Sequence, residues 1–449
     1  MCFTEKERVG TGMSLIAQKT KLEELRGKLY AKAKAEPALR FYTLYDKICR
    51  WDVLLEALKQ SKSKHGAPGV DGQTFEQIEE YGEERWLQEL QQQLQEKTYQ
   101  PQPVRRVLIP KPGGGERPLG IPTIKDRVAQ GAAKLILEPI FEADLSDAAY
   151  GYRPKRSAVQ AVEEVRRLLK EGRTEVVDAD LAKYFDTIPH AELIVSLARR
   201  IGDGAVLHLI KLWLTVPVEE RDEQKRPRMG GGKRTTQGVP QGGVLSPLLA
   251  NVYINRLLLA FAKSAWMEWC GARIVNYADD FVVVCRKNAT EVLEKVKSWL
   301  TVMKLDLNPT KTSVKKAWKE SFVFLGYELG PQRYYGTQRW YLGLRPSKKA
   351  MGQFREKVGR LLKRGRSTPW EVIQGELNAT LKGWMQYFNR GSSQQRYNQL
   401  DRYVSGRVRN LMRRRHRLPS GTARFDYKEV HQDLGVVDLE QLWRSHARA

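Results

Sequence analysis

The stretch ARIVNYADDFVVVCRK, residues 272–287, holds two adjacent carboxylates, Asp279 and Asp280, between two strongly apolar runs. Runs this rich in Val, Ile and Phe predict a pair of β-strands that meet at Ala278–Asp280. A tight hairpin turn would ordinarily use Asn-Gly or Asp-Gly at that point. The departure from this rule indicates that the two carboxylates serve a purpose other than turn formation.

Two anions side by side among apolar residues repel one another and are costly to desolvate unless a cation compensates them. A third carboxylate comes from EVVDADL (175–181), a predicted strand in which apolar residues alternate with Asp178 and Asp180. Either of these aspartates could face the cation. Hard oxygen ligands suit Mg²⁺, with Mn²⁺ as a substitute.

Two such ions about 4 Å apart can activate a 3′-hydroxyl and stabilise a leaving pyrophosphate. The carboxylates therefore predict phosphoryl transfer at a two-metal centre. In a structural alternative, Asp279 caps a turn and Asp180 ends a strand. That alternative explains each residue alone, but it does not explain the set.

The charge of the chain indicates a polyanionic partner. Lys and Arg total 77 against 52 for Asp and Glu in 449 residues, which gives a net charge of +25 and a pI near 9.8. Nucleic acid is the leading partner for such a surface. No run of 18 or more apolar residues occurs and the start MCFTEKERVG has no apolar signal core, so we expect no membrane association and a cytoplasmic location.

The cysteines indicate neither a zinc site nor a disulfide framework. They are far apart and form no CxxC pair: Cys2, Cys49, Cys270 and Cys285. His431 and His446 near the end have no cysteine pairs beside them, so no Cys/His-rich endonuclease is expected and no target-strand cleavage is predicted.

The order of the predicted elements indicates an α+β fold. Apolar periodicity predicts helices over 14–60, 123–171, 190–216, 245–267 and 290–304. The segment VRRVLIPKPGGGERPLGIP (104–122) predicts two short strands around the tip Pro112–Glu116, and 221–238 is expected to be a polar, Gly-rich loop.

After predicted strands in SFVFLGYEL (321–329) and RWYLGL (339–344), the chain becomes helical and basic from about residue 346 to 417. The run RVRNLMRRRHR (407–417) carries more positive charge than a solvated helix face requires. We therefore expect a phosphate-binding surface there, formed by Arg407, Arg409, Arg413, Arg414 and Arg415.

Several sequence blocks resemble, in order, the reverse transcriptases encoded by group II introns. The blocks are GAPGVDG (66–72), RPLGIPTIKDRVAQ (117–130), YGYRPKRSA (150–158), DLAKYFDTI (180–188), QGVPQGGVLSPLLANVYI (237–254), YADD (277–280), LNPTKT (307–312) and FLGY (324–327). The segment LNATLKGWMQYF (377–388) resembles the thumb, or maturase domain X, of that family. A single YADD would be weak evidence, whereas this series in the right order is specific.

The resemblance implies a right-hand polymerase with fingers and palm followed by a helical thumb. The implied divisions are an N-terminal helical extension at 1–60, fingers at 61–175, a palm with the catalytic centre at 176–340, a thumb at 341–417 and a short C-terminal tail at 418–449. DNA binding is one role left open for the tail. The compact form of the family, which lacks the endonuclease domain, is the implied subclass.

The resemblance also assigns roles to individual residues. It places the catalytic and metal-binding ligands at Asp180, Asp279 and Asp280, with Asp186 six residues after the first of them. Phe185 falls where similar enzymes place a ring against the sugar 2′ carbon, which implies selection for dNTPs.

Further dNTP contacts are implied at Lys111, Arg117, Gln241 and Lys311. Lys111 and Arg117 flank the fingers hairpin and suit an incoming triphosphate, because Lys is a point charge and Arg a bidentate phosphate ligand. Lys311 is placed to protonate the leaving pyrophosphate. A solvated hairpin and a surface lysine are the structural alternatives.

Nucleic-acid contacts are implied at the template path, beside the nascent base pair and at the primer end. The residues are Tyr150, Arg153, Gly242, Gly243 and Gly326, in addition to Arg407, Arg409, Arg413, Arg414 and Arg415. The glycines would let backbone approach nucleic acid closely. A tight turn at a helix entry is the alternative for Gly242 and Gly243.

The function implied first is an RNA-directed DNA polymerase that copies an RNA template from a DNA primer, binds its parent intron RNA as a splicing cofactor and acts in retrohoming. A splicing-only RNA-binding maturase is disfavoured, because nothing in RNA binding requires three aspartates. A domesticated reverse transcriptase in DNA repair or phage defence would use the same chemistry. Only the presence of a flanking intron would separate it from the first function.

Overall fold

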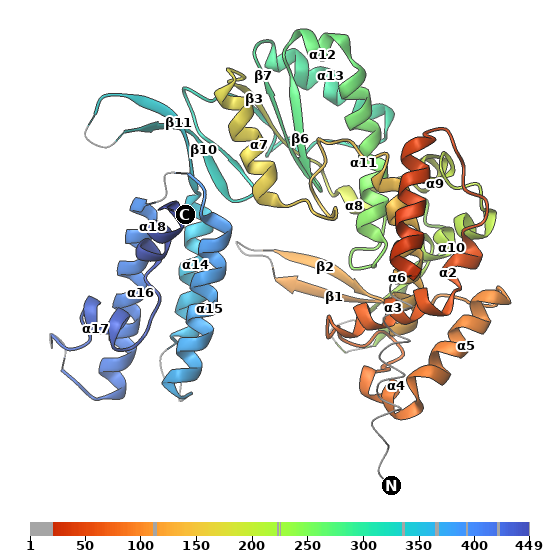
Figure 1. Cartoon of the computed structure of the whole chain (residues 1–449), viewed down its shortest axis with the longest axis horizontal. Coiled ribbons are helices and arrows are strands. Elements are labelled where there is room, and N and C mark those ends of the chain that lie inside the picture. The colour runs from red at the N-terminus through yellow and green to blue at the C-terminus, as the bar shows by residue number, and fades with distance from the viewer. Residues whose placement is uncertain are drawn as a thin grey trace.

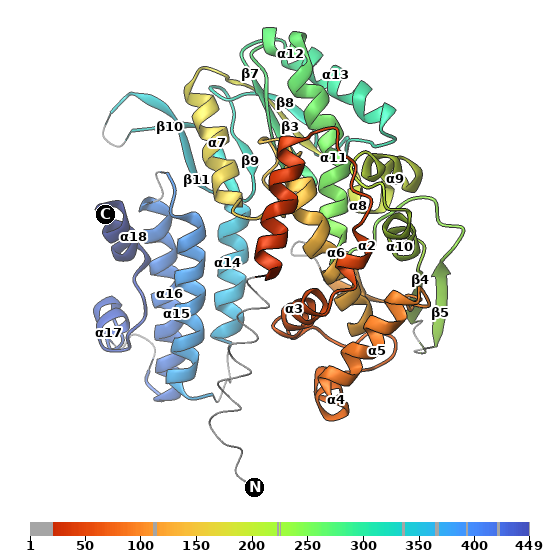
Figure 2. The ribbon, with the colours of Figure 1, turned by 45° about the vertical axis from the view of Figure 1, so that its right-hand side comes forward.

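The chain folds around three hydrophobic cores in this computed structural model (Figure 1). The structure describes residues 21–110, 115–221, 224, 226–334, 337–363, 368–391, 394–419 and 423–448. A central sheet carries an N-terminal arm of helices and strands and a C-terminal arm of helices, which stand apart below it (Figures 1 and 2). This is the expected α+β arrangement of palm, fingers and thumb.

The central sheet contains the strands predicted from the sequence. Its order is β6-β7-β3-β8, with all neighbours antiparallel. The strands are β6 (Arg273–Tyr277), β7 (Asp280–Cys285), β3 (Glu175–Asp180) and β8 (Ser313–Lys316). Side chains alternate between the two faces, so Phe281 and Val283 enter one core while Val282 and Val284 enter another.

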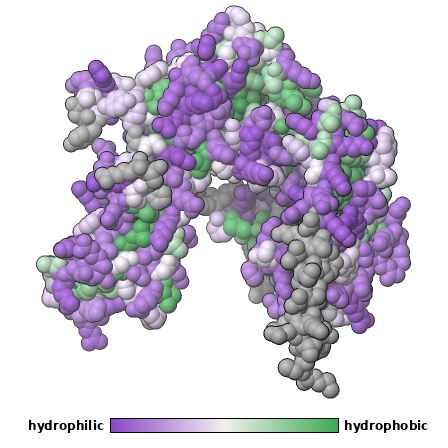
Figure 3. All heavy atoms as spheres, viewed as in Figure 1, coloured by the Kyte–Doolittle hydropathy of each residue, from purple (hydrophilic) through white to green (hydrophobic). Residues whose placement is uncertain are grey.

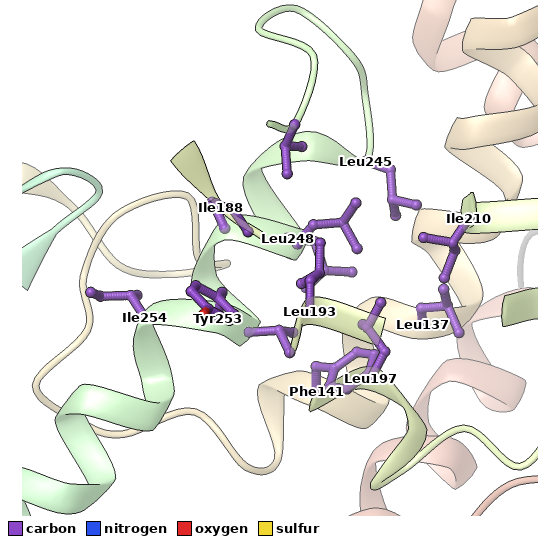
Figure 4. Packing of buried hydrophobic residues seen from close by; sticks show 14 of the residues in the cluster. Leu137, Phe141, Ile188, Leu193, Leu197, Ile210, Leu245, Leu248, Tyr253 and Ile254 are labelled. Atoms are coloured by element: carbon purple, nitrogen blue, oxygen red, sulfur yellow. The ribbon is translucent and has the colours of Figure 1, made fainter. Parts of the chain in front are cut away.

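Helices cover both faces of this sheet, which explains why its strands are apolar on both sides. The core on the first face takes in apolar residues of α8 (Tyr184–Thr187), α9 (His190–Ala198), α10 (Gly204–Leu214), α11 (Ser246–Lys263), α12 (Ala265–Trp269) and α13 (Ala289–Val302). The second face is packed by α7 (Ala158–Lys170). Figure 4 shows Leu193 and Leu197 of α9 between side chains of α6 (Ile124–Glu142) and α11.

The fingers continue the first core rather than forming a separate one. The helix at 21–35 and α2 (Tyr45–Ile48), α3 (Trp51–Lys62) and α5 (Glu83–Gln95) contribute apolar residues to the same cluster as α6. The short helix α4 (Phe75–Tyr81) precedes α5 and begins with a capping box at Thr74. The predicted hairpin is present as β1 (Val104–Pro110) and β2 (Glu116–Ile121).

One predicted loop is partly wrong. Within 221–238, β5 (Pro227–Gly231) pairs antiparallel with β4 (Pro217–Arg221), and β4 runs parallel to β1. The residues PRMGG show no alternation of apolar and polar side chains, because every residue of β5 is exposed. Backbone pairing to β4 stabilises this strand, and residue pattern could not reveal it.

The thumb has its own core and follows a small sheet. The sheet has the order β11-β10-β9 and consists of β9 (Phe322–Phe324), β10 (Tyr327–Arg333) and β11 (Trp340–Pro346). Three long helices come next: α14 (Lys348–Leu361), α15 (Trp370–Phe388) and α16 (Gln394–Arg415). An apolar stripe on α15 is buried at Ile373, Leu377, Leu381 and Phe388, and Trp384 on the same stripe is half-buried.

The segment that the sequence left unassigned completes the thumb core. Its helices α17 (Tyr427–Gln432) and α18 (Leu439–Arg448) bury Val430 and Leu439 against α16. Asp401 of α16 accepts hydrogen bonds from the backbone N–H of Leu439 and Glu440 at 2.9 and 3.0 Å, which fixes the start of α18.

No helix among the described ranges combines the length and the apolar character that crossing a bilayer requires.

We predict that Asp401→Asn changes how stability depends on pH. Burial raises the pKa of Asp401 to about 7. Because this value lies above the pKa of about 4 for an unfolded aspartate, the stabilisation from the bound proton is full below pH ~4 and is lost as the pH rises through the folded-state pKa. The amide that replaces the carboxyl group of Asp401 would not titrate. As the pH rises from about 5 to about 8, the free energy of unfolding of the variant should therefore rise relative to that of wild type.

Thermal unfolding of both full-length proteins across that range measures the effect. Asp433→Asn, at an exposed carboxylate just after α17, is the control and should keep a constant offset from wild type. A constant offset for Asp401→Asn as well would contradict the prediction.

Candidate active site

The three predicted catalytic aspartates meet at one end of the central sheet. Asp180 is the last residue of β3 and lies directly opposite Asp280, the first residue of β7. Directly opposed residues of antiparallel strands point to the same face. Asp279 stands in the turn just before β7, and its carbonyl oxygen accepts a hydrogen bond from the N–H of Leu181 at 3.2 Å.

The turn that carries Asp279 is strained and is held by a buried side chain. Ala278 has φ of +58°, a left-handed conformation that residues other than glycine rarely adopt. The Nδ2 of Asn276 donates to the carbonyl of Ala278 at 2.9 Å and reaches that of Asp280 at 3.3 Å. Asn276 was not predicted from the sequence, although a polar residue inside an otherwise apolar strand was a signal that could have identified it.

A neighbouring loop supports the same turn from outside the hairpin. The backbone of Asn276 exchanges hydrogen bonds with Ala148 and Tyr150 at 2.8 and 2.9 Å. A Cβ on Gly151 would lie 2.5 Å from the nitrogen of Ala278, so only glycine allows this approach. The carbonyl of Gly151 in turn accepts from Asn251 of α11 at 2.8 Å.

The carboxylates are crowded enough to perturb one another. Burial, followed by the charges of Asp279 and Asp180, raises the pKa of Asp280 to about 7. Lys311 acts in the opposite sense, because its Nζ lies 2.9 Å from Oδ2 of Asp180. The pKa of Lys311 is raised chiefly by that hydrogen bond. The centre therefore holds more negative charge than its own protein cation balances.

The second aspartate of β3 has a different partner. Oδ2 of Asp178 accepts from Nζ of Lys315 on β8 at 3.0 Å, and burial raises the pKa of Asp178. Because Asp178 lies opposite Val282 rather than an aspartate, it is one step removed from the cluster. This register favours Asp180 as the ligand, as the resemblance implied.

The loop at 306–312 fixes Asp180 and delivers Lys311. The N–H of Asn308 donates to the carbonyl of Asp180 at 2.8 Å, and its Nδ2 lies 3.3 Å from Oδ2 of the same residue. Asn308 also accepts from Thr310. The predicted Lys311 is thus brought to the catalytic cluster, and Asn308 is a supporting residue that sequence reasoning missed.

Phe185 lies at the edge of this cluster beneath a second aromatic ring. Its ring is buried and makes an edge contact with Tyr152, with centroids 6.3 Å apart. Tyr152 is 46% exposed and has φ of +56°. Burial, followed by the charge of Asp279, raises the pKa of Tyr152. Tyr152 therefore contacts Phe185 and lies within electrostatic reach of Asp279.

Two family models match this chain. The model described as reverse transcriptase (RNA-dependent DNA polymerase) matches residues 109–329, which include all three aspartates. The model described as group II intron, maturase-specific domain matches residues 351–428, which cover the long thumb helices. The chain is a member of the group II intron reverse transcriptase and maturase family. As a member of this family, it is an RNA-directed DNA polymerase.

Relatives of this reverse transcriptase differ in how much of their length it covers. It is 36% identical over 358 residues to Protein YkfC of Escherichia coli strain K12, across 71% of this chain and 91% of that protein. It is 35% identical over 218 residues to Group II intron-encoded protein LtrA of Lactococcus lactis subsp. cremoris, across 48% of this chain and 35% of LtrA. The chain thus spans about a third of LtrA.

Among solved structures, the partial Cas6-RT-Cas1--Cas2 complex matches 58% of this chain and 43% of that one, with 27% identity and a TM-score of 0.34.

Reverse transcriptases use divalent metal ions, and the donors at this centre fit them. Crowded carboxylates with a surplus of negative charge provide the hard oxygen ligands that such cations prefer. Within the described ranges, no group of three or more His, Cys, Asp and Glu side chains is arranged as a ready-made metal site. The three aspartates are half-buried at the strand ends.

The fingers reach the palm through Gln241. Its Oε1 accepts from Nε of Arg117 on β2 at 3.2 Å, and its Nε2 donates to Oδ1 of Asp186 at 3.1 Å. Asp186 is exposed and makes this contact rather than joining the aspartate cluster. Lys111 lies outside the described residues. The predicted Arg117 and Gln241 are thus brought together where the fingers hairpin meets the palm. Figure 3 shows the hollow between the two arms.

The two predicted glycines next to Gln241 lie too close to other atoms of the protein to carry a side chain. Gly242 has φ of +110°, and a Cβ there would lie 2.1 Å from the carbonyl oxygen of Gly120 on β2. A Cβ on Gly243 would lie 2.6 Å from the hydroxyl of Ser246 at the start of α11. These contacts match the alternative of a tight helix-entry turn, and they lock the fingers strand onto the palm.

Tyr150 and Arg153, the predicted template contacts, are largely enclosed by protein, and their role toward a template stays a prediction. Arg153 is 9% exposed, and its guanidinium donates to Glu142, Ser146 and Ala149 at 2.6–3.1 Å. Tyr150 is buried in the core behind the sheet. The motif YGYRP looked like a surface loop, but its Arg and first Tyr build the loop, and Tyr152 is the residue that faces the site.

Gly326 lies at a junction between palm and thumb. It has φ of +82°, and a Cβ there would approach the ring of Phe388 at 3.3 Å. The hydroxyl of Tyr387 donates to the carbonyl of Leu325 at 2.8 Å, and that of Tyr327 donates back to the carbonyl of Tyr387. The FLGY turn is therefore coupled to α15, and movement of the thumb would move it.

The five arginines predicted to bind phosphate, all on α16, divide into two groups. Arg409, Arg413 and Arg415 donate to backbone carbonyls of Phe425, Pro419 and Thr368, which tie neighbouring loops to α16. Arg414 is exposed and Arg407 is half-buried. A phosphate-binding surface at this helix end remains a prediction.

We predict that Asn276→Ala lowers primer extension by about 10- to 100-fold, because small misplacements of catalytic groups carry such costs. The variant loses the side chain that holds Ala278 and Asp280 in place. Steady-state extension, with folding checked by circular dichroism, measures the effect.

Asn255→Ala is the matched control. This asparagine is also buried and makes two backbone hydrogen bonds, to Ser146 and Asp144, away from the catalytic turn. Equal losses of activity in the two variants would show that Asn276 acts only on general stability.

Proposed function

We propose that this chain copies an RNA template from a DNA primer at a centre where Asp180, Asp279 and Asp280 hold two Mg²⁺ ions. The observation that carries the proposal is the direct pairing of Asp180 with Asp280, with Asp279 in a turn fixed by Asn276. Bound Mg²⁺ would supply the charge that activates a 3′-hydroxyl and stabilises the leaving pyrophosphate. Mn²⁺ would bind the same oxygen donors.

The remaining residues have separate tasks in this proposal. Arg117, held by Gln241 at the mouth of the site, binds the triphosphate with its other N–H donors. Lys311 balances Asp180 and, when a triphosphate is bound, holds a proton for the pyrophosphate oxygen that leaves. Lys111 on the same fingers hairpin is proposed as a second triphosphate contact.

Phe185 would exclude ribonucleotides by blocking the 2′-hydroxyl, and Tyr152 would hold the ring in place. The ring contact of Tyr152 with Phe185 supports this division of labour. Gly326 would position the primer end through its junction with the thumb. The exposed Arg414 and the half-buried Arg407 would bind RNA phosphates.

The maturase-specific domain supports a role in splicing, and we propose that its RNA partner is the parent intron, whose mobility would follow by retrohoming. The proposed location is the bacterial cytosol, where intron RNA, DNA and dNTPs meet. The divisions at residues 60, 175, 340 and 417 are likewise proposed boundaries.

We expect Asp279→Ala or Asp180→Ala to lower Mg²⁺-dependent primer extension by at least about 1,000-fold, because charge stabilisation at the reacting phosphate is lost. RNA affinity should stay within about threefold, since the phosphate contacts are elsewhere. The assay is extension of a DNA primer on an RNA template, with RNA binding measured in parallel.

Asp178→Ala is the matched control, because Asp178 shares the strand and the face but is paired with Lys315. It should retain most of the activity. Extension by the Asp279 variant above a few per cent of wild type would refute the assignment of the ligands.

Phe185→Ala should admit ribonucleotides and lower the preference for dNTPs by at least about tenfold, since removal of the ring opens space at the 2′ position. Single-nucleotide extension with dNTP or rNTP gives kcat/KM for each. Tyr184→Phe removes only a hydroxyl that donates to Ala250 in the core, and it should leave the preference unchanged. An unchanged preference in Phe185→Ala would show that another group selects the sugar.

A further inference from the structure

The hairpin of β10 and β11 extends beyond the body of the palm, on the side away from the fingers (Figures 1 and 2). Its base is anchored, because Leu329 and Leu344 are buried in the core behind the sheet. Toward the tip the strands separate from that core, and Arg333, Tyr334, Arg339 and Trp340 are all exposed. This part of the hairpin is not needed to cover apolar residues of the palm.

Large aromatic side chains occupy the free end. Trp340 is 59% exposed and Tyr334 is 52% exposed. Successive residues of a strand point to opposite faces, so Trp340 and Tyr341 place rings on both sides of the ribbon. Tyr334 stacks beside Tyr341, with ring centroids 4.3 Å apart and planes inclined by 37°.

Two of the rings, Tyr334 and Tyr341, are held in position before any partner binds. Tyr341 donates through its hydroxyl to Oε1 of Gln332 at 3.2 Å. Gln332 lies over Gly343, where a Cβ would come within 2.2 Å of its side chain. The N–H of Tyr334 donates to the carbonyl of Arg339 at 3.0 Å. Rigid aromatic groups lose little conformational entropy on binding.

The charge near the rings is mainly positive. From residue 329 to 355 the sequence contains six Lys or Arg and no Asp or Glu. Arg345 is paired with Glu328 at the base of the hairpin, at 2.6 Å, and the other cations favour an anion. Lys348 and Lys349 are exposed in the first turn of α14, where the helix dipole disfavours cations. A polyanionic partner would compensate this arrangement.

We propose that the end of the β10–β11 hairpin, formed by Arg333, Tyr334, Arg339, Trp340 and Tyr341, binds an unpaired RNA strand. Exposed rings flanked by cations bind single strands by stacking on bases while cations contact phosphates. An apolar protein surface would gain nothing from the arginines. RNA is the nucleic acid chosen because β11 leads directly into the maturase-specific domain at residue 351.

This site is distinct from the polymerase centre. The hairpin end lies on the far side of the thumb junction from the hollow between the arms (Figures 1 and 3). Template bound in that hollow would leave the rings free. The strand held by the hairpin is therefore a second RNA segment, such as an unpaired loop of a structured RNA.

The test uses full-length protein whose polymerase centre is first saturated with an RNA–DNA primer–template hybrid. Binding of a fluorescent 12-nucleotide RNA without secondary structure is then measured by anisotropy. Trp340→Ala should weaken binding of the RNA by about tenfold, since stacking on one ring contributes that much. Trp340→Phe should restore most of the affinity, and extension of the bound primer should stay at the wild-type level in both variants.

Trp269→Ala is the matched control. Trp269 is also 59% exposed, but it lies on α12 with Nζ of Lys287 stacked 3.3 Å from its ring centroid. This variant should bind the RNA like wild type.

Three outcomes would overturn the proposal. In one, Trp340→Ala and the double variant Tyr334→Ala/Trp340→Ala bind the RNA like wild type. In another, the affinity is lost only for a DNA oligomer of the same sequence. In the third, affinity for the primer–template hybrid falls by the same factor, which would place the rings in the duplex path. Because extension is read separately, failure of the polymerase proposal would be seen independently of this one.

Discussion

The crowding of Asp180, Asp279 and Asp280 at the end of two central strands is the constraint on which the rest of the structure depends. Three carboxylates can share this corner only if backbone geometry holds them there against their repulsion. The raised pKa of Asp280 and the ion pair between Asp180 and Lys311 are two signs of that cost. A divalent cation bound there, as we propose, would relieve that repulsion.

The surrounding fold supplies the rigidity that this corner needs. The sheet is packed on both faces, and Asn276, Gly151 and Asn251 connect the strained turn to a loop and to α11. The fingers hairpin is joined to the palm through Gln241, which accepts hydrogen bonds from Arg117 and from the N–H of Gly120. The FLGY turn is joined to the thumb through Tyr387.

The C-terminal part adds surfaces rather than catalytic groups. Helices α17 and α18 complete the thumb core, and several arginines of α16 serve that packing by binding loop carbonyls. The β10–β11 hairpin contrasts with this, because its rings and cations pack on little of the protein. A polymerase that also handles folded RNA requires contact surfaces outside its catalytic hollow, and this hairpin has the chemistry for one.

The sequence by itself determined the elements with strong local patterns. Apolar strands that end in adjacent carboxylates, helices with one apolar face and the ordered motifs predicted the α+β fold, the three aspartates and the thumb helices. Only the tertiary structure decided the roles of residues whose partners are distant in the chain. Arg153 was buried against Glu142, and Gly242 was required by the close approach of Gly120. The strand β5 formed through its pairing with β4. Periodicity reports which face of an element is buried, whereas such pairings depend on how elements far apart in sequence pack together.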